Sequence, residues 1–359
     1  MKALIIDDLK RLGGGRRSAL IFADVFKELG YSPYFLTNVD KVENSAIPVA
    51  FRVNYNFKEN SPGIVDLVKI LDLKRQLAKI KTGDFEIRFN HHPNVFVTRG
   101  NINVLHGFSF LDPWINGNGE IVKRLPPIAL RILGLYRDYG SLDFFPNSMY
   151  TKMLSKNLFD QMEIDARVGD VLYPPIFHKE NDILEKKEQV VILGRISATK
   201  GIDIAVKMSN KGNFKLIIGG YLNEGDEYFL EKLRKGARNN IEIRVNISEK
   251  EKIDLLKESS TILSISGKEN FGISVAEAMD FGCVPIVVRS GGPWVDLIER
   301  GKYGIGFADF DEIPDLVNRS FGYNINERVR IANSVERFSI SKFRNRLREI
   351  IEMVVPNHK

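Results

Sequence analysis

The chain has almost no cysteine, and this scarcity is the first constraint on its function. A single residue, Cys283, stands among 359. One thiol excludes an internal disulfide and a metal site built from cysteines, and it is typical of a reducing compartment. The five histidines form no cluster with carboxylates at metal-ligand spacing. We therefore expect no metal ion and no cofactor.

Long hydrophobic runs are absent as well. No stretch approaches the ~18 apolar residues that a membrane-spanning helix needs. The first residues, Met1–Asp8, reach acidic side chains too early for a signal peptide. Together these features predict a cytoplasmic protein.

The net charge is modest, +6 at pH 7. It is compatible with an anionic ligand or a membrane surface, but no basic stripe with interleaved aromatic residues occurs, so we expect no nucleic-acid partner. The hydrophobic and charged fractions, 43% and 27%, are those of a globular protein, and the length suits two domains.

The glycine-rich segment Gly13, Gly14 and Gly15 lacks the spacing of the dinucleotide fingerprint and of the P-loop. It is either a loop that lets the backbone approach a phosphate or a sugar, or a plain turn. The residues alone leave both interpretations open.

Two β-α-β openings organise the chain. One starts at Ala3–Ile6, continues through the glycine loop 12–17 into a helix, and the other starts at Val190–Leu193. They predict two α/β domains, residues 1–176 and 177–338. A basic amphipathic helix at 339–359 closes the chain, and we expect it to pack on the first domain.

The most informative segment runs from Glu269 to Glu277. A strand at 261–266 precedes it and a strand at 282–288 follows it, so it lies at the carboxyl end of a parallel strand, where open α/β sheets bind ligands. A helix that begins near Gly272 places Glu277 roughly 8 Å along its axis, at about 1.5 Å per residue. One carboxylate can hold a sugar, the free amides of the helix N-terminus a diphosphate, and the other carboxylate a ribose. The alternative is a loop carboxylate that complements the helix dipole.

Arg195 and Lys200 follow the first strand of the second domain. Cations at that position can neutralise a leaving diphosphate, although loop cations are commonly just solvated. In the first domain, His106 ends the strand 101–105, where it suits a hydrogen bond to a sugar hydroxyl or a structural role. We interpret the acidic pair at Asp309 and Asp311 as a surface turn.

Taken together, these residues resemble the retaining two-domain GT-B glycosyltransferases of family 4. The strongest parts are Gly194-Arg195 with Lys200-Gly201, Lys268 to Met279, and Gly282 to Pro285. The resemblance implies two Rossmann-like domains facing across a cleft, with the C-terminal helix returning to the first domain. It also implies a metal-independent transfer that retains the anomeric configuration.

The resemblance also implies roles for individual residues. Arg195 and Lys200 would bind the diphosphate of the donor, Glu269 the sugar hydroxyls and Glu277 the ribose. His106 would complete the site from the first domain. The remaining donor-binding candidates are backbone positions: Gly194, the amides of Phe271, Gly272, Ile273, Ser274 and Val275, and the loop Gly13, Gly14 and Gly15.

Two departures from the family pattern bear on this expectation. The segment Ser290–Ile298 resembles the variant of enzymes that extend lipid-linked oligosaccharides with mannose, which favours mannose over glucose as the hexose. The usual acid before the arginine of the first glycine loop is replaced by Gly15. The expected partners are a nucleotide sugar and a saccharide or lipid-linked saccharide acceptor.

A membrane surface is a further possible partner. Residues 121–133 combine apolar side chains with Lys123, Arg124 and Arg131, which fits either a peripheral contact at the cytoplasmic membrane face or an ordinary core helix. Two other functions stay open from the sequence. The chain is compatible with a nucleotide-sugar-binding partner without catalysis, or with a nucleotide-sugar epimerase of the same broad fold.

Overall fold

The computed structural model describes most of the chain, and the account below concerns those residues: 1–7, 9, 14–42, 45–53, 71–91, 98, 100–107, 138–161, 165–176, 183, 185–223 and 225–355. The chain forms two compact units. Unit 1 comprises Met1–Tyr173 and Phe343–Lys359, and unit 2 comprises Pro174–Lys342.

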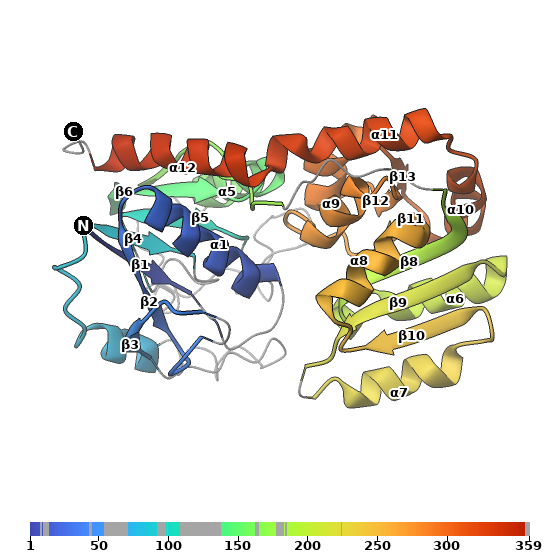
Figure 1. Ribbon diagram of the computed structural model, residues 1–359, viewed down its shortest axis with the longest axis horizontal. Coiled ribbons are helices and arrows are strands. Elements are labelled where there is room, and N and C mark those ends of the chain that lie inside the picture. Colours follow the sequence, from blue (N-terminus) through green and yellow to red (C-terminus); the bar gives the residue numbers. More distant parts are fainter. Residues whose placement is uncertain are drawn as a thin grey trace. The chain divides into compact units, whose positions relative to one another are not determined.

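Unit 1 is a parallel sheet with helices packed against it (Figure 1). Among the described residues the strand order is β3-β2-β1-β4-β5-β6-β7. The strands are β1 (Lys2–Ile6), β2 (Ser32–Thr37), β3 (Val49–Arg52), β4 (Ile87–Asn90), β5 (Ile102–Leu105), β6 (Asp138–Pro146) and β7 (Asp165–Val168), and the helices are α1 (Gly14–Glu28), α5 (Met149–Gln161) and α12 (Ile340–Val354).

The C-terminal helix α12 packs on α1, and the two lie side by side in Figure 1. Phe343 stacks on Phe22 with ring centroids 5.0 Å apart, and Arg344 pairs with Glu28. Along α12, Phe343, Leu347, Ile350 and Ile351 are buried, which is the spacing of one helix face. The last helix therefore completes unit 1.

Unit 2 contains a second parallel sheet, of order β10-β9-β8-β11-β12-β13. Its strands are β8 (Lys187–Arg195), β9 (Lys215–Tyr221), β10 (Ile241–Val245), β11 (Ser259–Ser264), β12 (Val284–Val288) and β13 (Ile305–Phe307). Its helices and helical turns are η2 (Ala198–Lys200), α6 (Ile202–Gly212), α7 (Glu227–Gly236), α8 (Glu249–Glu258), α9 (Ile273–Asp280), η3 (Pro293–Leu297), η4 (Glu299–Gly301), η5 (Phe310–Glu312), α10 (Ile313–Phe321), α11 (Ile325–Ser334) and η6 (Val335–Phe338).

The strands form because continuous apolar runs fill both faces of a sheet that helices cover. β1 and β11 show it, with burial of nearly every residue. Each sheet reverses its strand order at one point, between β1 and β4 in unit 1 and between β8 and β11 in unit 2. The prediction of an α/β chain with two Rossmann-like domains is confirmed.

Several predicted boundaries are corrected. Gly14 and Gly15 do not lie in a loop but in the first turn of α1. The amides of a first turn have no acceptor within the helix, and glycine is tolerated there. Gly194 and Arg195 end β8 instead of following it, because they pair with Gly220 and Tyr221 of β9. The strand predicted at 261–266 ends at Ser264.

Some predictions fall on residues outside the described ranges. Gly13 and the segment 121–133 are among them, so their predicted roles stay predictions. In the described part, no helix is long and apolar enough to cross a membrane.

Candidate functional site

The loops that follow β8 and β11 bring two predicted site residues together. Lys200 Nζ donates a hydrogen bond to Glu269 Oε2, and the two side chains are about one-third and one-quarter exposed. These loops leave the strands on either side of the point where the order of the sheet reverses. Ligands of open α/β sheets bind at that point, outside the carboxyl ends of the strands.

Lys200 is held by a tight turn at the end of η2. Gly201 has φ +66°, and a Cβ there would lie 2.8 Å from Ile265 Cγ2. A side chain at 201 would therefore be strained and would push Ile265 away. The close approach of Gly201 to Ile265 connects the turn after β8 with the loop after β11.

The loop that carries Glu269 is held by Ser290, Gly291 and Gly292. The Gly292 amide donates to the Glu269 carbonyl at 2.7 Å, and Ser290 Oγ donates to the Gly267 carbonyl at 3.2 Å. A Cβ on Gly292 would lie 2.1 Å from the Asn270 carbonyl oxygen, so only glycine fits. The sequence analysis placed these glycines in the segment Ser290–Ile298 and missed that they support the Glu269 loop.

Helix α9 begins at Ile273 with Gly272 as its N-cap, close to the predicted start. Gly272 has φ +94° and provides no side-chain cap. Its carbonyl accepts hydrogen bonds from the amides of Val275 and Ala276, both at 3.0 Å. The Val275 amide is thus engaged within the helix, whereas Ile273 and Ser274 lie at positions whose amides have no acceptor within a helix.

Glu277 pairs with a lysine that sequence reasoning missed. Lys252 Nζ donates to both carboxylate oxygens of Glu277, at 3.0 and 3.1 Å, and both side chains are more than four-fifths buried. Lys252 stands on α8, whose start is fixed by a capping box between Ser248 and Glu251. The Ser-x-x-Glu pattern predicts the start of α8, but it does not predict the contact of Lys252 with Glu277 on α9.

The other two catalytic candidates are not part of this ion pair. Arg195 ends β8 in register with Tyr221 of β9. His106 belongs to unit 1, directly after β5, whereas Lys200, Glu269 and Glu277 belong to unit 2. Phe271 is buried against Phe338, with ring centroids 5.1 Å apart.

His106 is part of a row of polar side chains that follow neighbouring strands of unit 1. Asp7, His91, His106 and Asn147 come directly after β1, β4, β5 and β6. His91 Nδ1 lies 2.8 Å from Asp7 Oδ2, and the rings of His91 and His106 meet edge to face at 4.0 Å. Sequence reasoning selected only His106, because the strand order that aligns the others cannot be read from the chain.

Burial decides the charge of both histidines. It lowers the pKa of His91 to about 3, so that its contact with Asp7 is a hydrogen bond from a neutral ring. Burial, together with the neighbouring His91, lowers the pKa of His106 well below its usual value.

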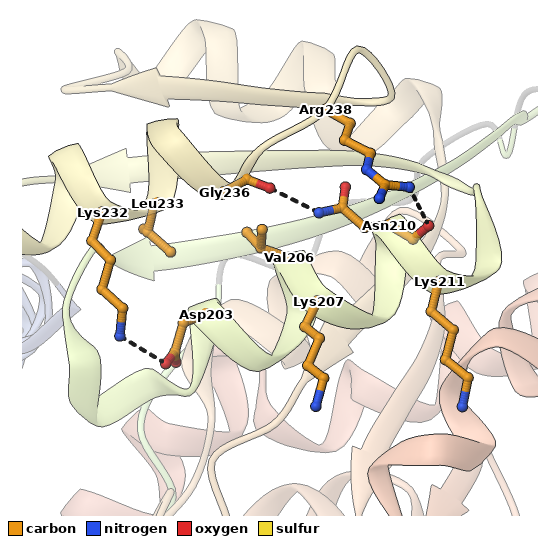
Figure 2. A pocket seen from close by; sticks show the side chains of 9 residues that line it. All are labelled: Asp203, Val206, Lys207, Asn210, Lys211, Lys232, Leu233, Gly236 and Arg238. Atoms are coloured by element: carbon orange, nitrogen blue, oxygen red, sulfur yellow. Dashed lines mark hydrogen bonds and ion pairs between the residues drawn. The ribbon is translucent and has the colours of Figure 1, made fainter.

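A separate hollow of about 670 Å³ lies between α6 and α7. Figure 2 shows Lys232 directed toward Asp203, and Asn210 bonded to the Gly236 carbonyl at 2.8 Å. None of the predicted site residues lines it, so it does not mark the site built on Lys200 and Glu269.

Within the described ranges, no group of three or more His, Cys, Asp or Glu side chains is placed to hold a metal ion. Asp309 caps the exposed turn η5, as expected for a surface turn.

Comparison with known proteins finds a family match within the second unit. Residues 175–320 match the family described as Glycosyl transferases group 1, a range that includes Arg195, Lys200, Glu269 and Glu277. The predicted resemblance to glycosyltransferases is confirmed over these residues.

Relatives with assigned functions match parts of the chain. The GDP-Man:Man(3)GlcNAc(2)-PP-Dol alpha-1,2-mannosyltransferase of Mus musculus is 32% identical over 136 residues, which are 36% of this chain and 27% of the relative. The Xenopus tropicalis protein of the same name is 34% identical over 233 residues, 58% of this chain and 47% of the relative. The chain thus spans less than half the length of these two relatives.

A solved structure matches nearly the whole chain. Anabaena HepE in complex with UDP has a TM-score of 0.69 and 16% identity, and the match covers 98% of this chain and 100% of that one. At this identity the similarity establishes the fold alone.

Proposed function

We propose that this chain, whose residues 175–320 belong to the glycosyl transferases group 1 family, is a hexosyltransferase that uses a nucleotide sugar. The acceptor is a saccharide or a lipid-linked saccharide. Mannose is the favoured hexose, because the matched relatives are named as mannosyltransferases that use GDP-Man, and glucose is the second candidate.

The observation that carries this proposal is the contact between Lys200 and Glu269. A cation and a carboxylate face each other across the two loops at the reversal point of a parallel sheet. A nucleotide sugar has groups that fit both partners. Its diphosphate accepts from the ammonium, and its sugar hydroxyls donate to the carboxylate. Binding the donor exchanges one internal ion pair for two contacts with the ligand.

The chemistry follows from where charge develops. In the transfer, the bond between the anomeric carbon and the diphosphate oxygen breaks, and its electron pair leaves with the diphosphate. A bond forms between that carbon and the acceptor oxygen, and the acceptor proton passes to a phosphate oxygen of the leaving group. Lys200 and Arg195 place positive charge where the diphosphate gains negative charge, which lowers the barrier.

Helix α9 supplies the other donor contacts in this proposal. The amides of Ile273 and Ser274 lie at the N-terminal end of the helix, where a phosphate binds favourably. Glu277 accepts from the ribose hydroxyls, and Lys252 holds its carboxylate in one orientation. The pair is mostly buried, so the carboxylate is preorganised before the nucleotide arrives.

We further propose that the transfer needs no metal ion and retains the anomeric configuration. Arg195 and Lys200 provide the positive charge that a divalent ion supplies in other transferases. Transfer is expected to proceed at an unchanged rate in EDTA, and proton NMR of the product is expected to show the anomeric configuration of the donor. An inverted product would overturn the assignment of mechanism.

The first test is thermal unfolding with GDP, UDP, ADP, GDP-mannose and UDP-glucose, in EDTA. A nucleotide present at ~100 times its dissociation constant stabilises the protein by about 2.7 kcal/mol. We expect GDP and GDP-mannose to raise the melting temperature, and Lys200→Ala to reduce that shift. The matched control is Lys211→Ala, which removes an exposed lysine paired with Asp311 in the same unit.

The outcomes separate the candidate functions. Stabilisation with transfer of radiolabelled sugar to a lipid-linked saccharide supports the proposal. Stabilisation without transfer to any saccharide would favour a binding partner without catalysis, and conversion of the donor to another nucleotide sugar would favour an epimerase. No stabilisation by any nucleotide would rule out the site as drawn.

A further inference from the structure

The hollow between α6 and α7 in unit 2 gathers positive charge that the proposed transfer does not use. Its volume of about 670 Å³ is within the range of small-molecule sites. One face of α6 and the residues from 232 to 238 line it (Figure 2): Asp203, Val206, Lys207, Asn210, Lys211, Lys232, Leu233, Gly236 and Arg238. Four of these residues are cations and one is an acid. Lys211 is balanced by Asp311, at 3.0 Å.

The other three cations are less well balanced. Lys232 Nζ lies 3.8 Å from Asp203 Oδ2, farther than the ~2.9 Å of a close charge-assisted hydrogen bond. Lys207 and Arg238 form no ion pair with any residue that the structure describes. Arg238 Nη1 donates to the Asn210 carbonyl at 3.5 Å, which is a long contact. Cations that lie together without enough carboxylates favour an anion, and a phosphate accepts from several of them at once.

The hollow also contains an acceptor without a donor. Asn210 Nδ2 donates to the Gly236 carbonyl at 2.8 Å, which turns the amide oxygen of Asn210 away from Gly236. That oxygen, Oδ1, is inaccessible to solvent and has no hydrogen-bond partner within the described part of the chain. A buried acceptor without a donor destabilises the protein, and a hydroxyl group of a ligand would satisfy it.

We propose that the hollow binds a phosphate ester of a hydroxylated ring. Lys207 and Arg238 hold the phosphate. When Arg238 turns from the Asn210 carbonyl to the phosphate, Asn210 Oδ1 accepts from a ring hydroxyl. Val206 and Leu233, which are 5% and 2% exposed, provide the apolar surface against which the carbon atoms of the ring pack. This site is separate from the loops of Lys200 and Glu269, and it does not depend on the proposed function.

Methyl NMR tests the site directly, because Val206 and Leu233 carry methyl groups on its lining. Their signals in protein labelled at valine and leucine are identified by their loss in Val206→Ile and Leu233→Ile. We expect both residues to shift on titration with glucose 6-phosphate and neither to shift with glucose.

A second titration separates a free ligand from a lipid headgroup. Vesicles of phosphatidylcholine with and without phosphatidylinositol present the same ring chemistry on a surface or omit it. Sedimentation of the protein with phosphatidylinositol vesicles alone, without a methyl shift by glucose 6-phosphate, would identify the headgroup as the source. Neither a methyl shift nor sedimentation would overturn the proposal.

Charge reversal of Lys207 locates the anion. Lys207→Glu is expected to weaken binding of whichever probe binds by about 10-fold, through lost attraction and new repulsion. The matched control is Lys235→Glu, which makes the same change in net charge at an exposed lysine of α7 outside the hollow. Equal losses in both variants would show attraction to net charge only, and would contradict a site.

Asn210→Ala tests the hydroxyl contact. It is expected to weaken glucose 6-phosphate binding by about 3- to 10-fold and to leave the binding of inorganic phosphate unchanged. Lys200→Ala is expected to keep the shifts of Val206 and Leu233. Loss of these shifts in Lys200→Ala, with no effect of Lys207→Glu, would place the anion at the donor loops and refute the proposal. Lys207 is exposed, so its variant decides the outcome even if Asn210→Ala does not fold.

Discussion

Lys200 is the residue on which the proposed chemistry depends most directly. Its ammonium group pairs with Glu269 in the free protein, and the side chain is one-third exposed. A partly exposed ion pair contributes at most about 1 kcal/mol to folding, because water screens it. The same cation acts far more strongly on a diphosphate that gains charge during the reaction.

Lys200→Ala is therefore expected to lower kcat by ~10²–10³-fold, while the free energy of unfolding changes by less than about 1 kcal/mol. Single-turnover kinetics and urea unfolding measure the two effects. Lys211→Ala is the control, since its pair with Asp311 is of the same kind but lies on the exposed side of α6 and η5. Equal proportional losses of stability and rate in Lys200→Ala would show that the lysine acts through the fold.

At the residue scale the sequence identified the charged groups but not their partners. Lys200, Glu269 and Glu277 stand out because strand-loop-helix patterns bring them to the carboxyl end of a sheet. Lys252 could not be selected, because its importance comes from a contact between elements far apart in the chain. Such contacts depend on strand order, and periodicity within one element carries no information about it.

At the scale of elements, the connection between β11 and α9 is limited by glycine geometry. A Cβ on Gly272 would lie 2.8 Å from Pro293 Cγ, and the residue has a positive φ that costs other residues ~1–2 kcal/mol. Gly225 has a similar φ of +96° but open space around it. Substitutions at the two positions therefore distinguish the cost of the dihedral angle from the cost of a steric clash.

Gly225→Ala is expected to destabilise by ~1–2 kcal/mol from the dihedral angle alone. Gly272→Ala is expected to cost about 1–3 kcal/mol more, because η3 must move away from the new methyl group. Urea unfolding of both variants provides the comparison. Equal losses would mean that Pro293 moves aside freely, and the loop would then be less rigid than its contacts indicate.

The start of α9 and the ends of most strands could be predicted because apolar runs and glycine stops are local signals. The first turn of α1 was predicted wrongly, since consecutive glycines resemble a loop in the sequence. The end of β8 was also predicted too early. Gly194 and Gly220 lie opposite each other, and a Cβ on Gly220 would lie 1.7 Å from the Gly194 carbonyl oxygen. Glycine is needed at position 220 because the neighbouring strand leaves no room for a Cβ, and this contact cannot be read from one strand alone.

At the scale of the whole molecule, each sheet has a side-chain contact that spans the point where its strand order reverses. In unit 2 the contact of Lys200 with Glu269 spans the loops after β8 and β11, and in unit 1 the bond between His91 and Asp7 spans the ends of β1 and β4. The second contact is buried and its histidine is neutral, so it links the stability of unit 1 to pH.

The sign of this dependence follows from proton binding. His91 has a pKa of about 3 when folded and near 6.5 when unfolded, so between these values the unfolded chain binds more protons. Stability is complete above pH ~6.5 and is lost as the pH falls toward 3, by up to about 1.4 kcal/mol per pH unit. Urea midpoints between pH 7 and 5 are expected to fall less steeply in His91→Gln. Parallel curves would contradict a neutral, buried His91.

The division of unit 1 between two parts of the chain also affects the order of events during synthesis. Phe343 and the rest of α12 leave the ribosome after all of unit 2, although they cover unit 1. Until then, Phe22 and its apolar neighbours on α1 lack the helix that shields them. Unit 2 can therefore complete its own sheet while unit 1 still lacks α12. A released chain truncated before Phe343 is expected to resist protease in the second unit and to be cleaved in the first.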